Sequence, residues 1–206
     1  YSNGIYKQFK DNLDKSIKTV EAVFMGKSQD FSAQITTLKD CSFIFMPIYY
    51  QPASVFMTQA KDIVNPDAVY FGCDGFDGID NIEGFDITSI PQAVTMLSHF
   101  NSKATDGAAK EFIDKYVEKY GAGTLNQFGA AAYDSVYAIY GAMEKAIAEG
   151  KKIPVTIGAS ELCEILKAQF TGGYTLTDAV TGDSISWDST GYVNKTAIQY
   201  VIKEAN

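Results

Sequence analysis

The stretch Cys41–Tyr50, CSFIFMPIYY, is apolar at nearly every position. A strand with one exposed face alternates polar and apolar residues, so this run fits a strand that is covered on both faces. Pro47 should end the pairing of that strand, because proline has no N–H to donate to a ladder. A second apolar run, AVYFG at 68–72, has the same character. The two runs predict neighbouring strands of a parallel sheet.

Helical patterns separate and surround these strands. Apolar residues four apart predict an amphipathic helix over about 2–17, and further helices are expected after Asp30 and from Pro52. The β-rich segment Thr19–Met25 predicts another buried strand. Helices and strands that alternate with short connections indicate the α/β class, with a parallel sheet and helices on both of its faces. A parallel crossover helix follows a strand, so a helix at residue 2 predicts a fragment cut just after a strand.

The second half of the chain changes in character. Residues 73–92 are predicted to be a loop, and 93–100 to be extended. Helices are expected over 109–120, over 128–147 and after Ser160, and the second of these is apolar on most faces and should be largely buried. The tail from Thr175 onward alternates and contains turn dipeptides, which predicts strands.

Composition and charge narrow the possible functions. The 206 residues include 17 basic and 25 acidic side chains, a net charge of -8, and 46% are hydrophobic, as in ordinary folded proteins. An acidic chain without a Lys/Arg cluster repels phosphate backbones, so no nucleic-acid partner is expected. No apolar window approaches about 18 residues, so no transmembrane segment is expected either. Cys41, Cys73 and Cys163 are far apart and odd in number, and we expect buried free thiols.

Catalytic and metal-binding patterns are not found in the sequence. The single histidine, His99, has no cysteine or histidine nearby, and is expected to be a surface or hydrogen-bonded residue. The acidic stretch from Asp74 to Glu83 has Phe76 where a calcium loop needs an oxygen ligand. No nucleophile elbow, phosphate loop or zinc-protease motif occurs. The sequence therefore predicts a protein that is not an enzyme and has no metal or cofactor.

Seven ordered motifs resemble the type I periplasmic binding proteins, specifically the branched-chain amino-acid group of ABC-transporter substrate-binding proteins. The motifs are YSNG (1–4), DFSAQ (30–34), PIYYQ (47–51), GCDG (72–75), FIDKYVEKYG (112–121), YDSV (133–136) and TGDSISWDSTG (181–191). Each is weak alone, but together they cover nearly the whole chain in order. Two departures are Trp187 in place of the usual Phe, and Gln92–Val94 in place of a Glu-Gly-Val crossover.

The resemblance implies a two-lobed fold, here incomplete, that closes over a ligand at the carboxyl ends of its parallel strands. It implies that 1–92 are the second lobe without its first strand, that 93–180 are the hinge crossover and the C-terminal part of the first lobe, and that 181–206 are the final crossover and return strands. It also implies an extracytoplasmic location, a small-molecule ligand such as an amino acid, and delivery to an ABC permease. The family's N-terminal part, which is absent from this chain, would hold the ligand's carboxylate.

Four residues are candidates for ligand binding on the same resemblance. Asp74 resembles the carboxylate that binds the ligand's ammonium, and the alternative is a turn aspartate before Gly75. Tyr49 resembles a tyrosine that faces the cleft, with Tyr50 pointing the other way. Tyr1 resembles a tyrosine that packs on the ligand. Phe128 lies where the family often places an aromatic residue near the ligand's side chain, although a core phenylalanine in a buried helix is the favoured alternative.

Other functions remain open at this point. The same fold serves as a ligand-sensing receptor domain without a transport role. A flavodoxin-like enzyme would need a phosphate-binding loop after an early strand, and the sequence has none. An interaction module would expose a large apolar patch.

Overall fold

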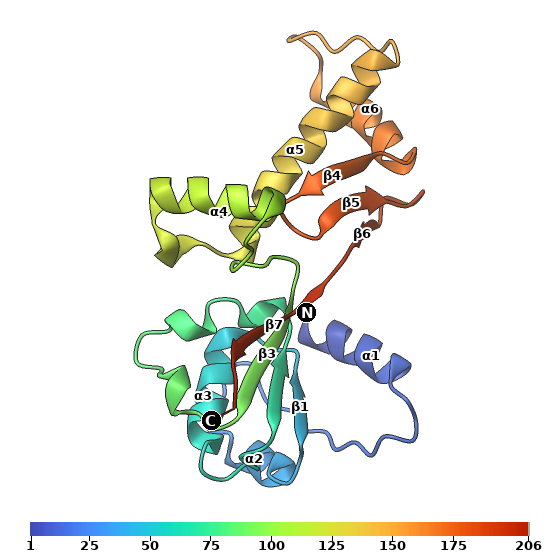
Figure 1. Ribbon diagram of the computed structural model, residues 1–206. Coiled ribbons are helices and arrows are strands. Elements are labelled where there is room, and N and C mark those ends of the chain that lie inside the picture. The colour runs from blue at the N-terminus through green and yellow to red at the C-terminus, as the bar shows by residue number, and fades with distance from the viewer. Residues whose placement is uncertain (206) are drawn as a thin grey trace. The chain divides into compact units, whose positions relative to one another are not determined.

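The structure is a computed structural model, which describes residues 1–205 and divides into two compact units. Unit 1 comprises Tyr1–Ser98 and the residues from Gln199 onward, and unit 2 comprises His99–Ile198. The chain therefore passes from one unit to the other twice, after Ser98 and after Ile198 (Figure 1).

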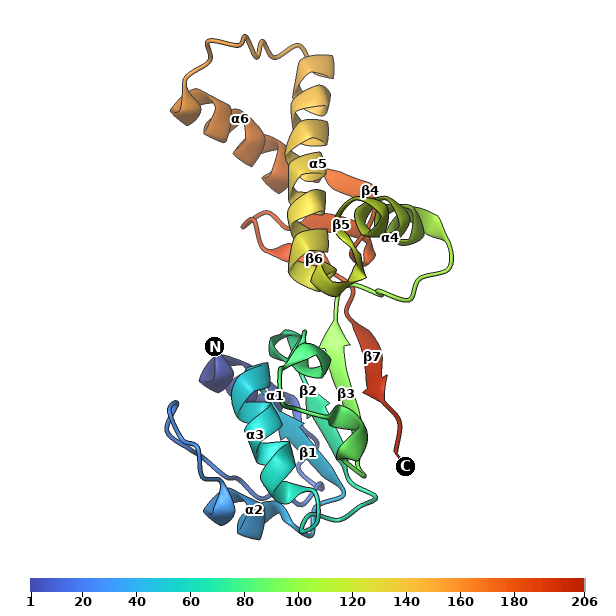
Figure 2. The same ribbon diagram turned by 90° about the vertical axis from the view of Figure 1, so that its left-hand side faces the viewer.

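A four-stranded sheet forms the centre of unit 1. Its strands are β1 (Phe43–Met46), β2 (Val69–Gly72), β3 (Ala93–Ser98) and β7 (Ile198–Lys203), in the order β1-β2-β3-β7 (Figure 2). β2 pairs in parallel with β1 and with β3. The parallel sheet predicted from the two apolar runs is confirmed.

Helices cover both faces of this sheet. On one face, Phe9 of α1 (Ser2–Asn12) packs on Phe45, with ring centroids 4.3 Å apart. On the other face, Phe56 of α3 (Tyr50–Ala60) meets Tyr70 edge-on at 6.1 Å. Successive residues of a strand point to opposite faces of the sheet, so an apolar strand can pack against the helices on both faces.

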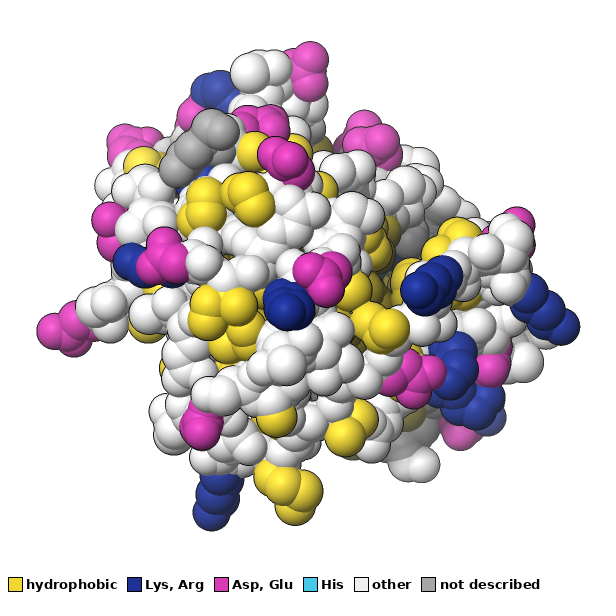
Figure 3. All heavy atoms as spheres, turned by 90° about the horizontal axis from the view of Figure 1, so that it is seen from below, with side chains coloured by type: hydrophobic (Ala, Val, Ile, Leu, Met, Phe, Trp, Pro, Cys, Tyr) yellow, Lys and Arg dark blue, Asp and Glu magenta, His cyan; other side chains and the backbone are white. Residues whose placement is uncertain are grey.

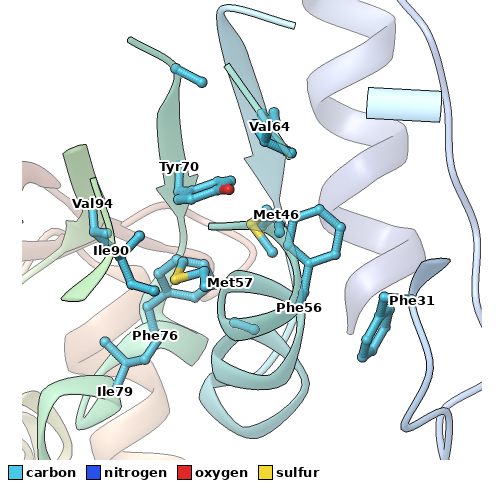
Figure 4. Close-up of a cluster of buried hydrophobic side chains, with 14 of the residues drawn as sticks. Phe31, Met46, Phe56, Met57, Val64, Tyr70, Phe76, Ile79, Ile90 and Val94 are labelled. Atoms are coloured by element: carbon cyan, nitrogen blue, oxygen red, sulfur yellow. The ribbon is translucent and has the colours of Figure 1, made fainter. Parts of the chain in front are cut away.

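The main core lies between the sheet and α3, where Met57, Phe76 and Val94 are fully buried (Figure 4). α2 (Ser32–Leu38) adds Ile35 to this core. The segment between β2 and β3, predicted as a loop, folds into three short 3₁₀ helices: η1 (Asp74–Phe76), η2 (Ile79–Asn81) and η3 (Ile87–Ser89). Ile79 extends the core from this segment.

Two predictions for the N-terminal region are wrong. α1 ends at Asn12 rather than near residue 17, because the backbone becomes extended at Leu13. Thr19–Met25 forms no strand, and Val23 and Met25 are 84% and 82% exposed. A strand needs a hydrogen-bonding neighbour along its length, and among the described residues no strand pairs with this segment.

Unit 2 combines helices with a small antiparallel sheet. The helices are α4 (Gly107–Tyr120), α5 (Gln127–Ala148) and α6 (Ala159–Thr171), with the 3₁₀ turn η4 (Ala122–Thr124) before α5. The strands β4 (Thr175–Ala179), β5 (Asp183–Trp187) and β6 (Val193–Lys195) pair in that order. The helices and tail strands predicted for this half are therefore present.

The prediction that 128–147 is largely buried is wrong. A single stripe of α5 is buried, consisting mostly of small residues: Ala130, Asp134, Ala138, Ala142 and Ala146. Large apolar side chains on the rest of the helix are exposed: Phe128, Tyr133, Val136, Tyr137, Ile139, Tyr140 and Ile147. Small residues let α6 and β4 approach this stripe closely, whereas outside it Tyr133 packs on Phe112 of α4 and stays 38% exposed.

The surface agrees with the composition. On the face drawn in Figure 3, acidic side chains and lysines are interspersed rather than gathered by sign. No helix in the described residues is long and apolar enough to cross a membrane.

The cysteines are free, and the prediction of burial is wrong for Cys163, which is exposed on α6, whereas Cys73 is buried and Cys41 is intermediate. The polar side of a surface helix explains the exposure of Cys163.

Candidate functional site

The candidate site lies at the carboxyl ends of two neighbouring strands of unit 1. β1 ends at Met46, and the chain reaches Tyr49, which is the N-cap residue of α3. β2 ends at Gly72, and Asp74 follows as the first residue of η1. β1 and β2 are parallel neighbours, so both chain segments leave the sheet at the same edge. Ligands of open α/β sheets bind outside this edge.

Tyr1 joins these two segments. Its hydroxyl donates a hydrogen bond to Asp74 Oδ1 at 2.5 Å and accepts one from the Gly75 N–H at 2.9 Å. Its ring stacks on that of Tyr49, with centroids 4.8 Å apart and an interplanar angle of 19°. The structure thus brings together three of the four candidate residues.

The environment of the Tyr1 hydroxyl favours its protonated form. Burial raises the pKa of Tyr1 above its ordinary value of 10.0, and the adjacent Asp74 carboxylate raises it further. The hydroxyl therefore keeps its proton at neutral pH and acts as the donor to Asp74. A tyrosine in this position orients the carboxylate rather than acting as a base.

Two glycines make this arrangement possible. A Cβ at Gly75 would lie 2.8 Å from both the Ile48 carbonyl oxygen and the Tyr1 hydroxyl. A Cβ at Gly72 would lie 2.2 Å from the Phe76 ring. From the sequence, these glycines were expected only as part of the GCDG motif and, for Gly75, as the residue after a turn aspartate; the contact of the Gly75 N–H was not expected. A glycine directly after the candidate aspartate was the signal that could have found it, because close approach to a backbone favours glycine.

Cys73 lies beside Asp74 but does not fit a catalytic role. It is 6% exposed, and burial followed by the Asp74 charge raises the pKa of its thiol to about 11. The thiolate, which is the nucleophilic form, is therefore scarce at neutral pH.

Tyr49 and Tyr50 point to different surroundings. Tyr49 is 52% exposed and contacts Tyr1, whereas Tyr50 packs against the core of unit 1. The two side chains point in different directions because α3 begins between them, and not because they alternate along a continuing strand.

The fourth candidate, Phe128, belongs to unit 2, near the start of α5. It is 59% exposed, so the alternative of a core phenylalanine is wrong. His99 is also in unit 2, and its Nδ1 lies 2.9 Å from the Thr196 carbonyl oxygen. This makes it a hydrogen-bonded histidine, one of the two alternatives given for it.

The chemistry of the site suits a cation with an apolar body. The Asp74 carboxylate offers a partner for an ammonium group, and the stacked tyrosine rings offer aromatic surface. Among residues 1–205, no group of three or more His, Cys, Asp or Glu side chains could hold a metal ion.

Comparisons with known proteins bear on the fold. No family model matches the chain, and no curated protein matches it. Solved structures do match. The leucine-binding protein LivK of Thermotoga maritima superposes with a TM-score of 0.75 at 22% identity, over 98% of this chain and 54% of its own.

Two further structures cover 98% of this chain and 57% of theirs. One is LivJ of Streptococcus pneumoniae, a branched-chain amino-acid transporter substrate-binding protein in complex with isoleucine, with a TM-score of 0.64 at 24% identity. The other is an extracellular ligand-binding receptor of Rhodopseudomonas palustris, with a TM-score of 0.69 at 18% identity.

The chain spans little more than half the length of these neighbours. At these identities the likeness shows the fold, and it confirms at that level the resemblance found in the ordered motifs. This chain has the type I periplasmic binding fold, which is the fold of the branched-chain amino-acid substrate-binding proteins of ABC transporters, and it covers about half of the length of those proteins.

Proposed function

We propose that the chain is part of an extracytoplasmic solute-binding protein that captures a small amino acid and delivers it to an ABC permease. In this proposal, residues 1–92 belong to the second lobe, 93–180 to the hinge crossover and first lobe, and 181–206 to the final crossover and return strands. The role is binding without catalysis. Neighbours of the same fold support it, since LivJ is a transporter substrate-binding protein in complex with isoleucine.

The observation that carries the proposal is the contact of Tyr1, Tyr49 and Asp74 at the carboxyl ends of β1 and β2. Asp74 would accept the ammonium of the ligand, with Tyr1 holding the carboxylate in place. A hydrogen bond to a charged group contributes about 1.5–3 kcal/mol, enough to select amino acids over plain carboxylic acids. Phe128 is proposed as an apolar contact of the ligand's side chain from unit 2.

A ligand with two charges needs partners for both. Burying an unpaired charge is costly, so a group outside the Asp74 site must hold the ligand's carboxylate. Contacts from both lobes would then favour the closed form by their difference in affinity for the open and closed states. We therefore expect unit 1 by itself to bind an amino acid weakly.

NMR titration of the 206-residue chain detects such weak binding. We expect leucine or isoleucine to shift the amide resonances of Asp74 and Gly75. 4-Methylpentanoate, which is leucine without its amino group, should leave them unchanged. The variant Asp74→Asn should lose the shifts, because an amide pairs poorly with an ammonium.

The matched control is Asp80→Asn, an exposed aspartate in the same β2–β3 connection. It should titrate like the parent chain. An Asp74→Asn variant that still shifts as the parent does would refute the assignment of the ammonium site.

A ligand-sensing receptor domain is the second candidate function. It is favoured by the neighbour from Rhodopseudomonas palustris, which is described as an extracellular ligand-binding receptor. Both candidates share the ligand site and differ in the partner. A gene neighbourhood that encodes a permease and an ATPase would favour transport, and one that lacks both would favour the receptor.

A further inference from the structure

A buried carboxylate in unit 2 is not used by the proposed ligand site. Asp134 of α5 is 3% exposed, and it accepts hydrogen bonds from the Val180 N–H at 2.9 Å and the Thr181 N–H at 2.8 Å. The Thr181 hydroxyl also donates to it. Thr181 is fully buried. These charge-assisted bonds hold the turn between β4 and β5 against the helix.

The turn held by Asp134 contacts the segment where the chain leaves unit 2. Gly182 follows Thr181 and has φ +84°, and a Cβ there would lie 3.0 Å from the Thr196 carbonyl oxygen. The same Cβ would lie 3.2 Å from Lys195 Cγ. Glycine is needed at this position on both counts, the left-handed backbone and the close approach.

Thr196 in turn contacts the segment where the chain enters unit 2. His99 Nδ1 is within hydrogen-bonding distance of the Thr196 carbonyl oxygen, at 2.9 Å. His99 is the first residue after one crossing, and Thr196 lies two residues before Ile198, the last residue before the other. A continuous set of contacts therefore runs from Asp134 through Thr181, Gly182 and Thr196 to His99.

We propose that Asp134 is a positioning residue that anchors both chain crossings to unit 2 through Thr181, Gly182 and Thr196. Both crossings are then fixed to helix α5 by the same set of contacts, and neither is fixed independently of the other. Lys195 fits this arrangement, since burial lowers the pKa of its ammonium while the charge of Asp134 opposes that shift. The proposal concerns the crossings alone and does not depend on the ligand.

Hydrogen–deuterium exchange of the 206-residue chain tests the anchor. In Asp134→Asn, amides in peptides covering 98–104 and 192–199 should exchange at least about tenfold faster, because a lost hydrogen bond to a charged group corresponds to one order of magnitude or more. His99→Ala should speed exchange near Thr196 and leave Val180 and Thr181 protected. This difference places Asp134 before His99 in the set of contacts.

The matched control is Gln169→Leu, which removes another buried polar contact made to α5. Gln169 is 5% exposed, accepts from Lys145 and donates to Glu149, both in the region where α5 ends. This variant should weaken the packing of α6 and leave both crossing peptides at the parent rate.

Two results would overturn the proposal: unchanged crossing peptides in Asp134→Asn, or an equal acceleration in Gln169→Leu. Should Asp134→Asn fail to fold, Thr181→Val removes the hydroxyl donor alone and preserves the side-chain shape. It should raise exchange at both crossings severalfold, and parent-like exchange there would count as failure. Since no ligand is added, this outcome is separable from that of the amino-acid titration.

Discussion

Units 1 and 2 are both apolar in sequence, but they bury their apolar residues very differently. The largest fully buried side chains of the described residues include Phe31, Phe76 and Tyr70 of unit 1, and Thr181 is the one member from unit 2. Unit 1 sandwiches a sheet between helices, so each strand serves two layers. In unit 2, α5 buries one stripe of small residues and exposes its aromatic side chains. Burial follows from the number of covering layers, and composition alone does not determine it.

The largest expected effect comes from removing an aromatic ring in unit 1. Phe76→Ala should lower the free energy of unfolding by about 3–5 kcal/mol, since it leaves a cavity at a fully buried site. Phe128→Ala, its matched control in unit 2, should change it by no more than about 0.5 kcal/mol because that ring is exposed. Urea unfolding followed by circular dichroism measures both. Equal losses for the two variants would show that the two rings are buried to the same extent, contrary to their exposed fractions.

The rate of thiol labelling should show the same contrast between a buried residue of unit 1 and an exposed residue of unit 2. At pH 8, iodoacetamide should modify exposed Cys163 at least about a hundredfold faster than Cys73, whose pKa is raised from 9.0 to about 11. The rate at Cys73 should rise with pH. A raised pKa means that the neutral thiol favours the folded state, so its contribution to stability is complete below pH 9.0 and is lost as the pH passes about 11.

Mass spectrometry of the labelled peptides separates the two sites. Cys163→Ser should remove the fast phase and leave Cys73 unchanged. Rapid labelling of Cys73 at pH 8 would show that the β2 end of unit 1 opens far more readily than its packing implies.

The smallest change in unfolding free energy is expected from overpacking the buried stripe of α5. Ala142→Leu adds three carbons to a fully buried position and should cost about 1–3 kcal/mol through overpacking. Val136→Ala, on an exposed position of the same helix, should stay within about 0.5 kcal/mol. Trp187, which packs on Phe170 in unit 2, provides a fluorescence signal for both. A larger loss for Val136→Ala than for Ala142→Leu would mean that the exposed face of α5 is covered in solution.

The fold of unit 1 was largely predictable because its signals are local. Runs such as CSFIFM and AVYFG are apolar at nearly every position, and helical spacing is visible between them. Thr19–Met25 is also rich in β-forming residues, yet it forms no strand, because pairing depends on a neighbour far away in sequence. The exposed side of α5 was missed for a related reason: periodicity shows that a helix is apolar, but it does not show how many of its faces are covered.

The candidate site was predictable residue by residue only through the ordered motifs. Asp74, Tyr49 and Tyr1 were named from the resemblance, and the structure brings them into contact. The hydrogen bond from the Gly75 N–H was missed, because the glycine after Asp74 signals a close approach to the backbone but does not show which group approaches. The contacts of Asp134 were missed as well, since YDSV and TGDSISWDSTG lie more than forty residues apart and their meeting is a tertiary fact.

The outer edge of β1 has a consequence for handling the protein. β1 is the terminal strand in the order β1-β2-β3-β7, so within residues 1–205 no strand pairs with its outer side. Phe43 on this strand is 49% exposed, and the extended segment with Val23 and Met25 displays further apolar side chains. Unpaired strand edges with apolar side chains are templates for aggregation. Aggregation should therefore increase steeply with protein concentration, and Phe43→Lys would be the first substitution to make in an expression campaign.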